Sequence, residues 1–353
     1  MAAWQMADGD KTLTVAPADI PTAAPHEIVI ETRATAVNPV DWVMQSMGRN
    51  AFGYLTCPTI FGFDVAGTVH AVGDRVTRFK VGDRVLGLSC REEDGPHSHK
   101  YRGAGYSSHA FVAERLAAPI PPEMAFHDAA VLPMGVCVAA TGLFQDDYLQ
   151  LQLPTIPAKR REEWLLITAG ASSIGACAIQ LATSAGYNVV TTSSPGNFGL
   201  VRSLGAAYTI DYHRPQQEQY DELVAFFSDK SLAGALSIGS ITDQTSTVES
   251  LCADVVARTP KPHSVKRKFV AFVSRVPQKL PEEIEHKFVW GTSLEYSSIG
   301  PAIFEDFLPK ALATGQIRPL PRALVVGHGL DAIQSALDRQ REGVSARKVV
   351  VTL

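Results

Sequence analysis

The turn A-G-A-S-S-I-G at residues 169–175 has the residue types of a phosphate-binding loop. It follows an apolar run and precedes a segment with helical periodicity. A strict G-x-G-x-x-G pattern would place its second glycine at position 172, where this chain has Ser172. Small residues let backbone N–H groups approach a pyrophosphate at a helix N-terminus, and Ser172 and Ser173 also add hydroxyl groups. The sequence therefore predicts a dinucleotide site here, the alternative being an ordinary tight turn.

The end of the next expected strand indicates which dinucleotide binds. An NAD site usually carries Asp or Glu at this point to hold the ribose 2′-hydroxyl. This chain has S-S-P-G-N at 193–197 instead, followed by Arg202. Hydroxyl groups, an amide and a guanidinium suit a 2′-phosphate, because arginine forms charge-assisted hydrogen bonds with phosphate oxygens. We therefore predict NADPH as the cofactor. For Arg202 alone, a solvated helix residue is the alternative.

Two further groups of residues have the types that metal sites use. Asp64 lies in F-G-F-D-V-A-G at 61–67, where it is open as a metal ligand, a catalytic acid or a scaffold residue. His97 and His99 form a pair in a polar loop, with no obvious third ligand nearby. Because Zn²⁺ takes three or four N, S or O ligands, we expect no metal at either place.

Composition excludes several classes of protein. The 353 residues are enough for two domains, and 46% hydrophobic with 19% charged residues is typical of a globular chain. A net charge of −4 favours neither nucleic acid nor an anionic membrane, and the short basic clusters 159–161 and 266–268 are expected to be solvated surface. We expect no membrane span and no secretory signal. Five scattered cysteines without C-x-x-C predict reduced thiols and a cytoplasmic location.

The elements that must position these residues differ along the chain. Alternating apolar residues at 28–34 predict a half-buried strand, and V-G-D-R-V occurs at both 72–76 and 81–85, which suggests a β-meander or small barrel. From residue 164 the pattern becomes strand, helix, strand, helix, strand, which predicts a doubly wound sheet. A polar loop is expected at 257–268 before a strand at 269–273. A helix around 331–341 and a strand at 348–353 should return to the first domain.

The chain resembles the medium-chain dehydrogenase/reductase superfamily over nearly its whole length. The motifs that carry this resemblance are N-P-V-D at 38–41, G-F-D-V-A-G at 62–67, V-G-D-R-V at 81–85, A-A-V-L-P at 129–133, A-G-A-S-S-I-G-A-C-A-I-Q-L-A at 169–182 and L-G-A-A-Y-T-I-D-Y at 204–212. It implies an α/β protein with two domains and the cofactor in the cleft between them. Residues 1–135 and 305–353 would form a GroES-like, β-rich catalytic domain, and residues 136–304 a Rossmann domain with a doubly wound parallel sheet.

Within the superfamily the chain is similar to the zinc-independent quinone oxidoreductase and enoyl reductase branch. The stretch 193–206 most resembles fungal trans-acting enoyl reductases of the lovastatin type, which partner polyketide synthases. Zinc alcohol dehydrogenases carry Cys at the position of Asn38 and a His-Glu pair at Phe63 and Asp64. Phenylalanine cannot ligate a metal, so the resemblance implies no zinc. Asp64 is then expected to be a scaffold acid, with a direct role at the nicotinamide as the alternative.

The resemblance also implies a set of contact residues. The cofactor contacts are Pro39, Val40, Asp41 and Trp42 at the nicotinamide end, with Phe272, Val273, Arg347 and Lys348; Ala171, Ser172, Ser173 and Ile174 at the pyrophosphate; and Ser194, Pro195, Gly196, Asn197, Arg202 and Tyr212 at the adenosine 2′-phosphate. The substrate residues are Ala139, Ala140, Thr141, Gly142, Leu143 and Phe144, with Gly291, Thr292, Ser293, Leu294 and Glu295. The alternatives are a core tyrosine for Tyr212 and strand core for Phe272 and Val273.

The implied reaction is reduction of an activated C=C bond. Hydride goes to the β-carbon, negative charge moves to the carbonyl oxygen, and a proton then reaches the α-carbon. The lovastatin-type relatives have Lys in N-P-x-D-x-K, where this chain has Val43, which cannot transfer a proton. Mitochondrial enoyl reductases use a Tyr in the following loop, where this chain has Tyr54. We hypothesise that Tyr54 or solvent supplies the proton, the alternative being that Tyr54 only packs on its loop.

Three functions remain open from the sequence. The first is an NADPH-dependent enoyl reductase acting in trans on a polyketide or CoA thioester, with a polyketide synthase carrier domain as a possible partner. The second is a free-standing quinone or alkene reductase for small electrophiles. The third is a catalytically silent nucleotide-binding accessory protein. Prolines in segment 257–268, just before an expected edge strand, favour a monomer.

Overall fold

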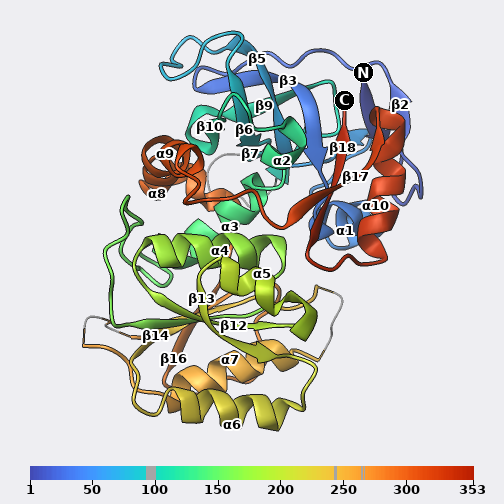
Figure 1. The fold of residues 1–353 in the computed structure, drawn as a ribbon. Helices are drawn as coiled ribbons and strands as arrows, with labels where there is room; N and C mark the ends of the chain where they lie inside the picture. The colour runs from blue at the N-terminus through green and yellow to red at the C-terminus, as the bar shows by residue number, and fades with distance from the viewer. Residues whose placement is uncertain (93–100, 242–244, 264, 266) are drawn as a thin grey trace. The chain divides into compact units, whose positions relative to one another are not determined.

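The structure is a computed structural model that describes residues 1–92, 101–241, 245–263, 265 and 267–353 (Figure 1). The chain forms two compact units, Met1–Met134 with Ile303–Leu353, and Gly135–Ala302. The boundaries expected from sequence, at 135/136 and 304/305, lie close to these. His97, His99 and Lys266, named above, lie outside the described residues.

The first unit is built on an extended β-sheet to which the C-terminal tail contributes. Its strand order is β10 (Ala117–Pro119), β6 (Arg84–Leu88), β5 (Asp64–Val72), β3 (Glu27–Ala36), β18 (Arg347–Thr352) and β17 (Arg322–His328), with β9 (His109–Ala113) also paired to β3. Strand β18 runs antiparallel to β3, so that Val351 lies opposite Thr35. The tail therefore completes this sheet, as the sequence predicted.

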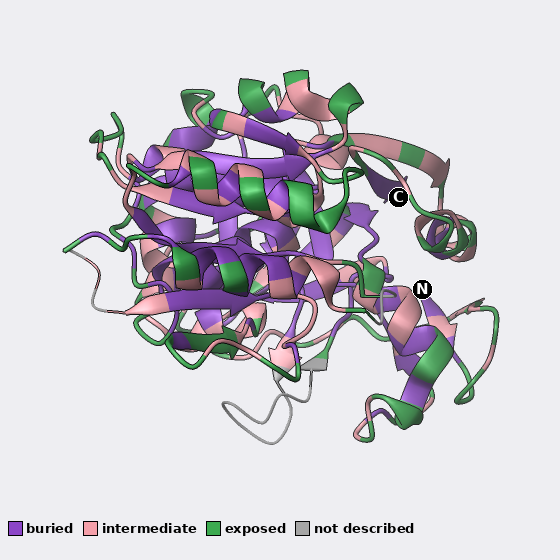
Figure 2. Cartoon of the chain, turned by 90° about the horizontal axis from the view of Figure 1, so that it is seen from below, coloured by how far each residue is buried: buried purple, intermediate pink, exposed green. Residues whose placement is uncertain are grey.

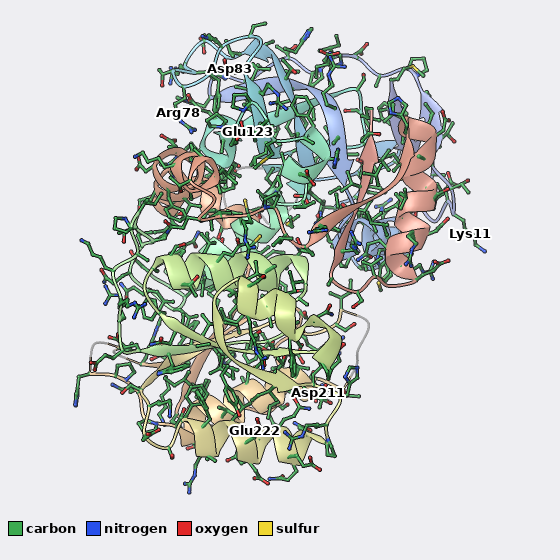
Figure 3. All side chains as sticks on the ribbon, in the orientation of Figure 1. Lys11, Arg78, Asp83, Glu123, Asp211 and Glu222 are labelled. Atoms are coloured by element: carbon green, nitrogen blue, oxygen red, sulfur yellow. The ribbon has the colours of Figure 1, made fainter. Side chains whose placement is uncertain are left out.

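Shorter elements surround that sheet. They are β1 (Ala2–Gln5), β2 (Thr14–Ala16), β4 (Thr59–Ile60), β7 (Arg91–Glu92), β8 (Tyr101–Arg102), α1 (Pro39–Met47), α2 (Phe126–Ala129), α9 (Leu308–Ala313) and α10 (Ile333–Arg341). Arg78, labelled in Figure 3, ties the tail segment to this unit. Its guanidinium donates to the carbonyl of Phe304 at 3.2 Å and lies 3.6 Å from the carboxylate of Glu305.

Alternation along β3 and β5 places one face of each strand in the core. Ile28, Ile30, Val65 and Val69 are almost fully buried and belong to one apolar cluster. Only the second V-G-D-R-V copy behaves as expected, because a turn at Gly82 leads directly into β6. The first copy ends β5 and is followed by irregular backbone rather than a strand.

The second unit has a six-stranded parallel sheet. Its order is β13 (Ala206–Asp211), β12 (Asn188–Ser193), β11 (Trp164–Ile167), β14 (Leu232–Ser237), β15 (Lys268–Phe272) and β16 (Ile284–Phe288). Its helices are α3 (Pro133–Phe144), α4 (Ser173–Ser184), α5 (Phe198–Ser203), α6 (Gln216–Phe226), α7 (Thr247–Arg258) and α8 (Ile299–Pro301). In Figure 1, α4 and α5 cover one face of the sheet, and α6 and α7 cover the other. This doubly wound arrangement confirms the predicted Rossmann fold.

Burial explains why the strands of this unit are continuous apolar runs. Leu166 and Val190 are inaccessible to solvent because helices cover both faces of a parallel sheet. Figure 2 shows the strands largely in the colour of buried residues, and the exposed residues on outer helix faces and loops. The stretch Phe126–Phe144 is long and apolar enough to cross a membrane by composition alone, but it is mostly buried, as a core helix would be.

Candidate functional site

The turn between β11 and α4 has the geometry of a phosphate-binding loop. Ser172 caps the helix, since its hydroxyl accepts a hydrogen bond from the N–H of Gly175 at 3.0 Å. A Cβ on Gly175 would lie 2.2 Å from the carbonyl oxygen of Ala169, so glycine is required there. Ala169 itself has φ of +49°, a left-handed conformation that is uncommon outside glycine.

The four predicted pyrophosphate residues lie at the N-terminus of α4. Ala171, Ser172, Ser173 and Ile174 are all partly exposed, whereas the helix beyond Gly175 is buried. The first N–H groups of a helix have no intrahelical acceptor, and the helix dipole favours negative charge there. The loop therefore fits a pyrophosphate, and contact with one stays a prediction.

The end of β12 presents polar groups without a carboxylate. The side chain of Asn197 donates to the hydroxyl of Ser194 at 2.9 Å, which shapes the Pro195–Asn197 turn. The hydroxyl of Ser193 is buried and has no hydrogen-bond partner among the described residues. A buried hydroxyl without a partner is costly, so this atom suits contact with a bound ligand.

Arg202 and Tyr212 flank that strand end from neighbouring elements. The guanidinium of Arg202, on α5, donates to the hydroxyl of Thr209 at 2.9 Å and lies over the ring of Phe198. Tyr212 follows β13 and is 48% exposed. The alternative of a buried core tyrosine is therefore wrong, and Tyr212 is accessible to a ligand.

Phe272 and Val273 differ in accessibility at the end of β15. Phe272 is fully buried within the apolar core of the second unit, whereas Val273 is partly exposed. The backbone N–H of Val273 donates to the carbonyl of Ser237 at 2.9 Å. The side chain of Phe272 is thus strand core, and contact of either residue with a nicotinamide stays a prediction.

The two predicted substrate segments are brought together within the second unit. The hydroxyl of Thr141, on α3, donates to the carbonyl of Gly291 at 3.3 Å. A Cβ on Gly291 would lie 2.7 Å from Val138, which shows how closely the segments pack. Residues 139–144 are all buried, whereas most of 291–295 is partly exposed. Their role in substrate binding stays a prediction, and 291–295 is the more solvent-accessible of the two segments.

A buried polar cluster lies in the first unit, around Asp64. The carboxylate of Asp64 accepts hydrogen bonds from the amide of Asn38 at 2.9 Å and from the backbone N–H of Met134 at 2.6 Å. The ammonium group of Lys348 lies 2.8 Å from the same carboxylate and donates to the side-chain oxygen of Asn38 at 2.5 Å. Asp64 is inaccessible to solvent, and Lys348 is 4% exposed. Asn38 and Asp64, at the positions of Cys and Glu in zinc alcohol dehydrogenases, are thus both in contact with the Lys348 ammonium.

Asp41 extends this cluster. One oxygen of its carboxyl accepts from the backbone N–H of Asn38 at 2.7 Å and from the hydroxyl of Tyr106 at 2.9 Å. The second oxygen is buried and has no partner within the part of the chain that the structure describes. Burial, opposed in part by these two hydrogen bonds, raises the pKa of Asp41 from 3.8 to about 7. Burial and the nearby Asp41 also raise the pKa of Tyr106 well above its usual value.

Sequence reasoning missed Tyr106. It follows G-A-G at 103–105, and no periodicity or spacing marks it as a partner of Asp41. The glycine at position 62 was the one sequence feature that pointed to a close contact. Gly62 has φ of +91°, and a Cβ added there would lie 2.5 Å from the ring of Tyr106. The first glycine of F-G-F-D-V-A-G therefore makes room for the tyrosine that holds Asp41.

The remaining residues predicted for the nicotinamide end have different surroundings. Pro39 and Arg347 are exposed and Val40 is partly exposed. The indole N–H of Trp42 donates to the side chain of Gln340 on α10 at 2.6 Å, so this side chain is held by the C-terminal helix. Lys348 is held by Asp64 and Asn38, as described above. Their contact with a nicotinamide stays a prediction.

Tyr54 lines a small cavity in the first unit. The cavity is formed by Met44, Tyr54, Leu55, Thr56, Thr59, Ile60, Phe61, Arg102 and Gly103. Tyr54 is partly exposed, and its ring meets that of Phe52 edge to face, with centroids 6.3 Å apart. The structure thus allows both the proton-donor hypothesis and the packing alternative.

Comparisons with known proteins agree with this architecture. The family model for the alcohol dehydrogenase GroES-like domain matches residues 24–122. Dehydrogenase azaJ of Aspergillus niger is 40% identical over 345 residues, covering 98% of this chain and 96% of its own. Trans-enoyl reductase himH of Aspergillus japonicus is 36% identical, covering 100% of this chain and 97% of its own.

A solved structure shows the same fold at lower identity. A mycobacterial protein in complex with NADPH has a TM-score of 0.72 at 20% identity, covering 100% of this chain and 99% of its own. Together with the phosphate-binding loop, these likenesses indicate an oxidoreductase that uses a nicotinamide nucleotide. The chain belongs to the medium-chain dehydrogenase/reductase family, to which these full-length dehydrogenase and trans-enoyl reductase relatives assign it.

Proposed function

We propose that the protein is an NADPH-dependent, zinc-independent enoyl reductase that acts on an α,β-unsaturated polyketide thioester, in trans with a polyketide synthase. The observation that carries the proposal is full-length similarity to a protein named trans-enoyl reductase. The end of β12 adds support for the phosphorylated cofactor, because it offers hydroxyls and an amide where an NAD site usually has a carboxylate.

The residues of the second unit fit such a cofactor. The Gly175 turn would bring backbone N–H groups to the pyrophosphate, and the unpartnered hydroxyl of Ser193 lies at the strand end that an adenine ribose would approach. Arg202 would supply the positive charge for a 2′-phosphate. NADPH, when bound, supplies the hydride.

Zinc independence is supported by the cluster around Asp64. A metal bound to Oδ2 of Asp64 would have to displace the Lys348 ammonium and the Asn38 amide, and one bound to Oδ1 would compete with the N–H of Met134. Phe63 offers no ligand atom beside it. The catalytic contribution of the chain would then be positioning and hydrogen-bond donation to the developing oxyanion.

Tyr54 is our candidate for proton delivery to the α-carbon. Its hydroxyl is an acid of the required kind, and Val43 cannot replace it. Tyr54→Phe is expected to lower kcat by about 10²-fold if the phenol is the donor. Full turnover by this variant would assign the proton to solvent.

We further propose a cytoplasmic monomer. The edge strand β16 carries the exposed charges of Glu285 and Lys287, which pair with Arg267 and Asp147 respectively. Charged side chains on an edge strand oppose pairing with a second chain. Size-exclusion chromatography with light scattering would test the monomer.

The central test is NADPH oxidation with defined acceptors. We expect turnover with an enoyl-CoA or enoyl-pantetheine thioester and little with a small quinone. Preference for the quinone would replace the proposal with a free-standing quinone reductase. NADPH binding without turnover of either acceptor, together with an effect on a partner synthase, would indicate an accessory protein.

A further inference from the structure

The segment that follows β13 places an acid beside the predicted 2′-phosphate site. Asp211 is the last residue of β13 and is the register partner of Ser193 at the end of β12. Neighbouring strands lie about 4.8 Å apart, so the two residues are close. The backbone N–H of Tyr212 also points to the carbonyl of Ser193, at 3.4 Å. A bare carboxylate here would favour ribose hydroxyls and repel a phosphate.

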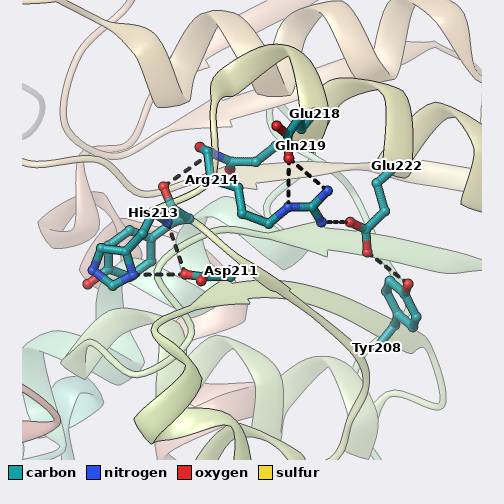
Figure 4. A network of polar contacts seen from close by, with 8 residues as sticks. Tyr208, Asp211, His213, Arg214, Glu218, Gln219 and Glu222 are labelled. Atoms are coloured by element: carbon teal, nitrogen blue, oxygen red, sulfur yellow. Dashed lines mark hydrogen bonds and ion pairs between the residues drawn. The ribbon is translucent and has the colours of Figure 1, made fainter.

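His213 covers that carboxylate. Both its backbone N–H, at 3.0 Å, and its ring Nδ1, at 2.8 Å, contact the same oxygen of Asp211 (Figure 4). The backbone hydrogen bond and the imidazole lower the pKa of Asp211, which is therefore ionised at neutral pH. His213 thus supplies the two hydrogen bonds described for this acid, and the charge of Arg214 also lowers its pKa.

Arg214, the residue after His213, forms its ion pairs with other acids. Arg214 pairs with Glu218, 3.1 Å away, and with Glu222, whose other oxygen accepts from Tyr208 at 2.8 Å. Figure 4 shows the Arg214 guanidinium directed toward these acids on α6. Asp211 and Glu222, labelled in Figure 3, both belong to this second unit.

The loop that carries His213 is held in a defined shape. The amide of Gln219 is buried and donates to the carbonyls of Tyr212 at 3.1 Å and Arg214 at 2.7 Å. The rings of Tyr212 and His213 lie 4.3 Å apart at 37°. The His213 side chain is 58% exposed while that of Asp211 is 24% exposed, so the imidazole is the more solvent-exposed member of this pair.

We propose that His213 is a positioning residue for cofactor choice, which covers the Asp211 carboxylate and so allows the strand end to accept a 2′-phosphate. The inference rests on the proposed use of NADPH. In this arrangement Asp211 holds the loop through His213, and the imidazole contacts the carboxylate oxygen directly. Removal of the imidazole exposes the acid, and the cost falls mainly on the dianionic 2′-phosphate that NADH lacks.

The test is equilibrium binding of NADPH and of NADH, measured by the fluorescence of the bound nucleotide at low ionic strength. His213→Ala is expected to weaken NADPH binding about fivefold, as two exposed charges at short range allow, and to change NADH binding less than about twofold. Asp211→Asn in the His213→Ala background is expected to restore NADPH binding. Raising the salt concentration should reduce the loss in His213→Ala.

His127→Ala is the matched control, because His127 and Asp128 form another exposed His–Asp pair, in the first unit. It should leave both affinities unchanged. Equal weakening of NADPH and NADH by His213→Ala, without rescue by Asp211→Asn, would overturn the inference while leaving NADPH use intact. A wild-type protein that binds NADH as tightly as NADPH would overturn the proposed cofactor together with the inference.

Discussion

The cluster around Asp64 and the cluster around Asp211 use the same kinds of residue in opposite environments. Both contain an aspartate, a basic side chain and a tyrosine. In the first, Asp64 and Lys348 are inaccessible or nearly so, and hydrogen bonds fix each atom. In the second, the Arg214 side chain is 41% exposed and that of His213 58% exposed. The difference is one of burial: the first cluster is shielded from water, and the second is in contact with it.

The physical reason is the cost of removing charge from water. A buried ion must keep its partner, because an unpaired one costs several kcal/mol. Exposed pairs are screened by solvent and contribute little to stability. A change of partner in the Asp211 cluster therefore costs little, whereas the loss of a partner in the buried Asp64 cluster costs much more.

Lys348→Met should give the largest effect on stability. The side chains have similar length, but the variant leaves Asp64 buried without its counter-ion. We expect the free energy of unfolding to fall by about 3–5 kcal/mol, measured by urea denaturation. Asp64→Asn in the same background should restore part of this loss, because it removes the unpaired charge.

Lys287→Met is the matched control for that comparison. Lys287 pairs with Asp147 at the surface, where their side chains are 44% and 55% exposed. The expected loss is below about 1 kcal/mol. Equal losses of unfolding free energy in Lys348→Met and Lys287→Met would show that burial does not determine how much an ion pair contributes to stability.

Asp41→Asn tests the buried cluster through pH. The folded protein keeps a proton on Asp41 up to about pH 7, whereas the unfolded chain releases it near pH 3.8. The contribution of the Asp41 proton to the free energy of unfolding is therefore fully present below pH 3.8 and is lost as the pH rises through 7. The total loss is up to about 4 kcal/mol. The asparagine variant should lack this part of the pH dependence.

Urea denaturation of both proteins between pH 4 and pH 8 would measure the difference. The difference in free energy of unfolding between the wild type and Asp41→Asn should decrease as pH increases. A constant difference across this range would mean that Asp41 is ionised throughout, and that Lys348 balances both carboxylates.

In the phosphate-binding loop at 169–175, we expect cofactor affinity to depend on backbone geometry. Gly175→Ala places a Cβ 2.2 Å from a backbone oxygen, so the turn must shift. We expect NADPH affinity to fall about tenfold or more in fluorescence titrations. Gly196→Ala is the control, since nothing lies within 4 Å of its added Cβ. A normal affinity in Gly175→Ala would show that the turn does not bind the pyrophosphate.

The sequence predicted the regular parts of this molecule better than its polar contacts. The apolar run at Trp164 and the turn up to Gly175 were sufficient to predict a Rossmann unit, because parallel strands and phosphate loops have local signatures. Asp64 was correctly expected to be a scaffold residue only through the resemblance. Its partners Lys348 and Met134 are 284 and 70 positions away, and nothing local indicates which distant groups will meet.

Two arginines of the second unit, Arg202 and Arg214, test the exposed cluster, and Arg214 has the smallest expected effect of all. Arg202 donates to the neutral hydroxyl of Thr209, whereas Arg214 is neutralised by Glu218 and Glu222. Arg202→Gln should weaken NADPH binding about tenfold and leave NADH binding unchanged, because the guanidinium can turn to a 2′-phosphate. Arg214→Gln should change NADPH affinity by less than about twofold and leave the unfolding midpoint unaltered. If Arg214→Gln instead weakens NADPH as much as Arg202→Gln does, then the acids of α6 release Arg214 to the cofactor, and both arginines recognise the phosphate.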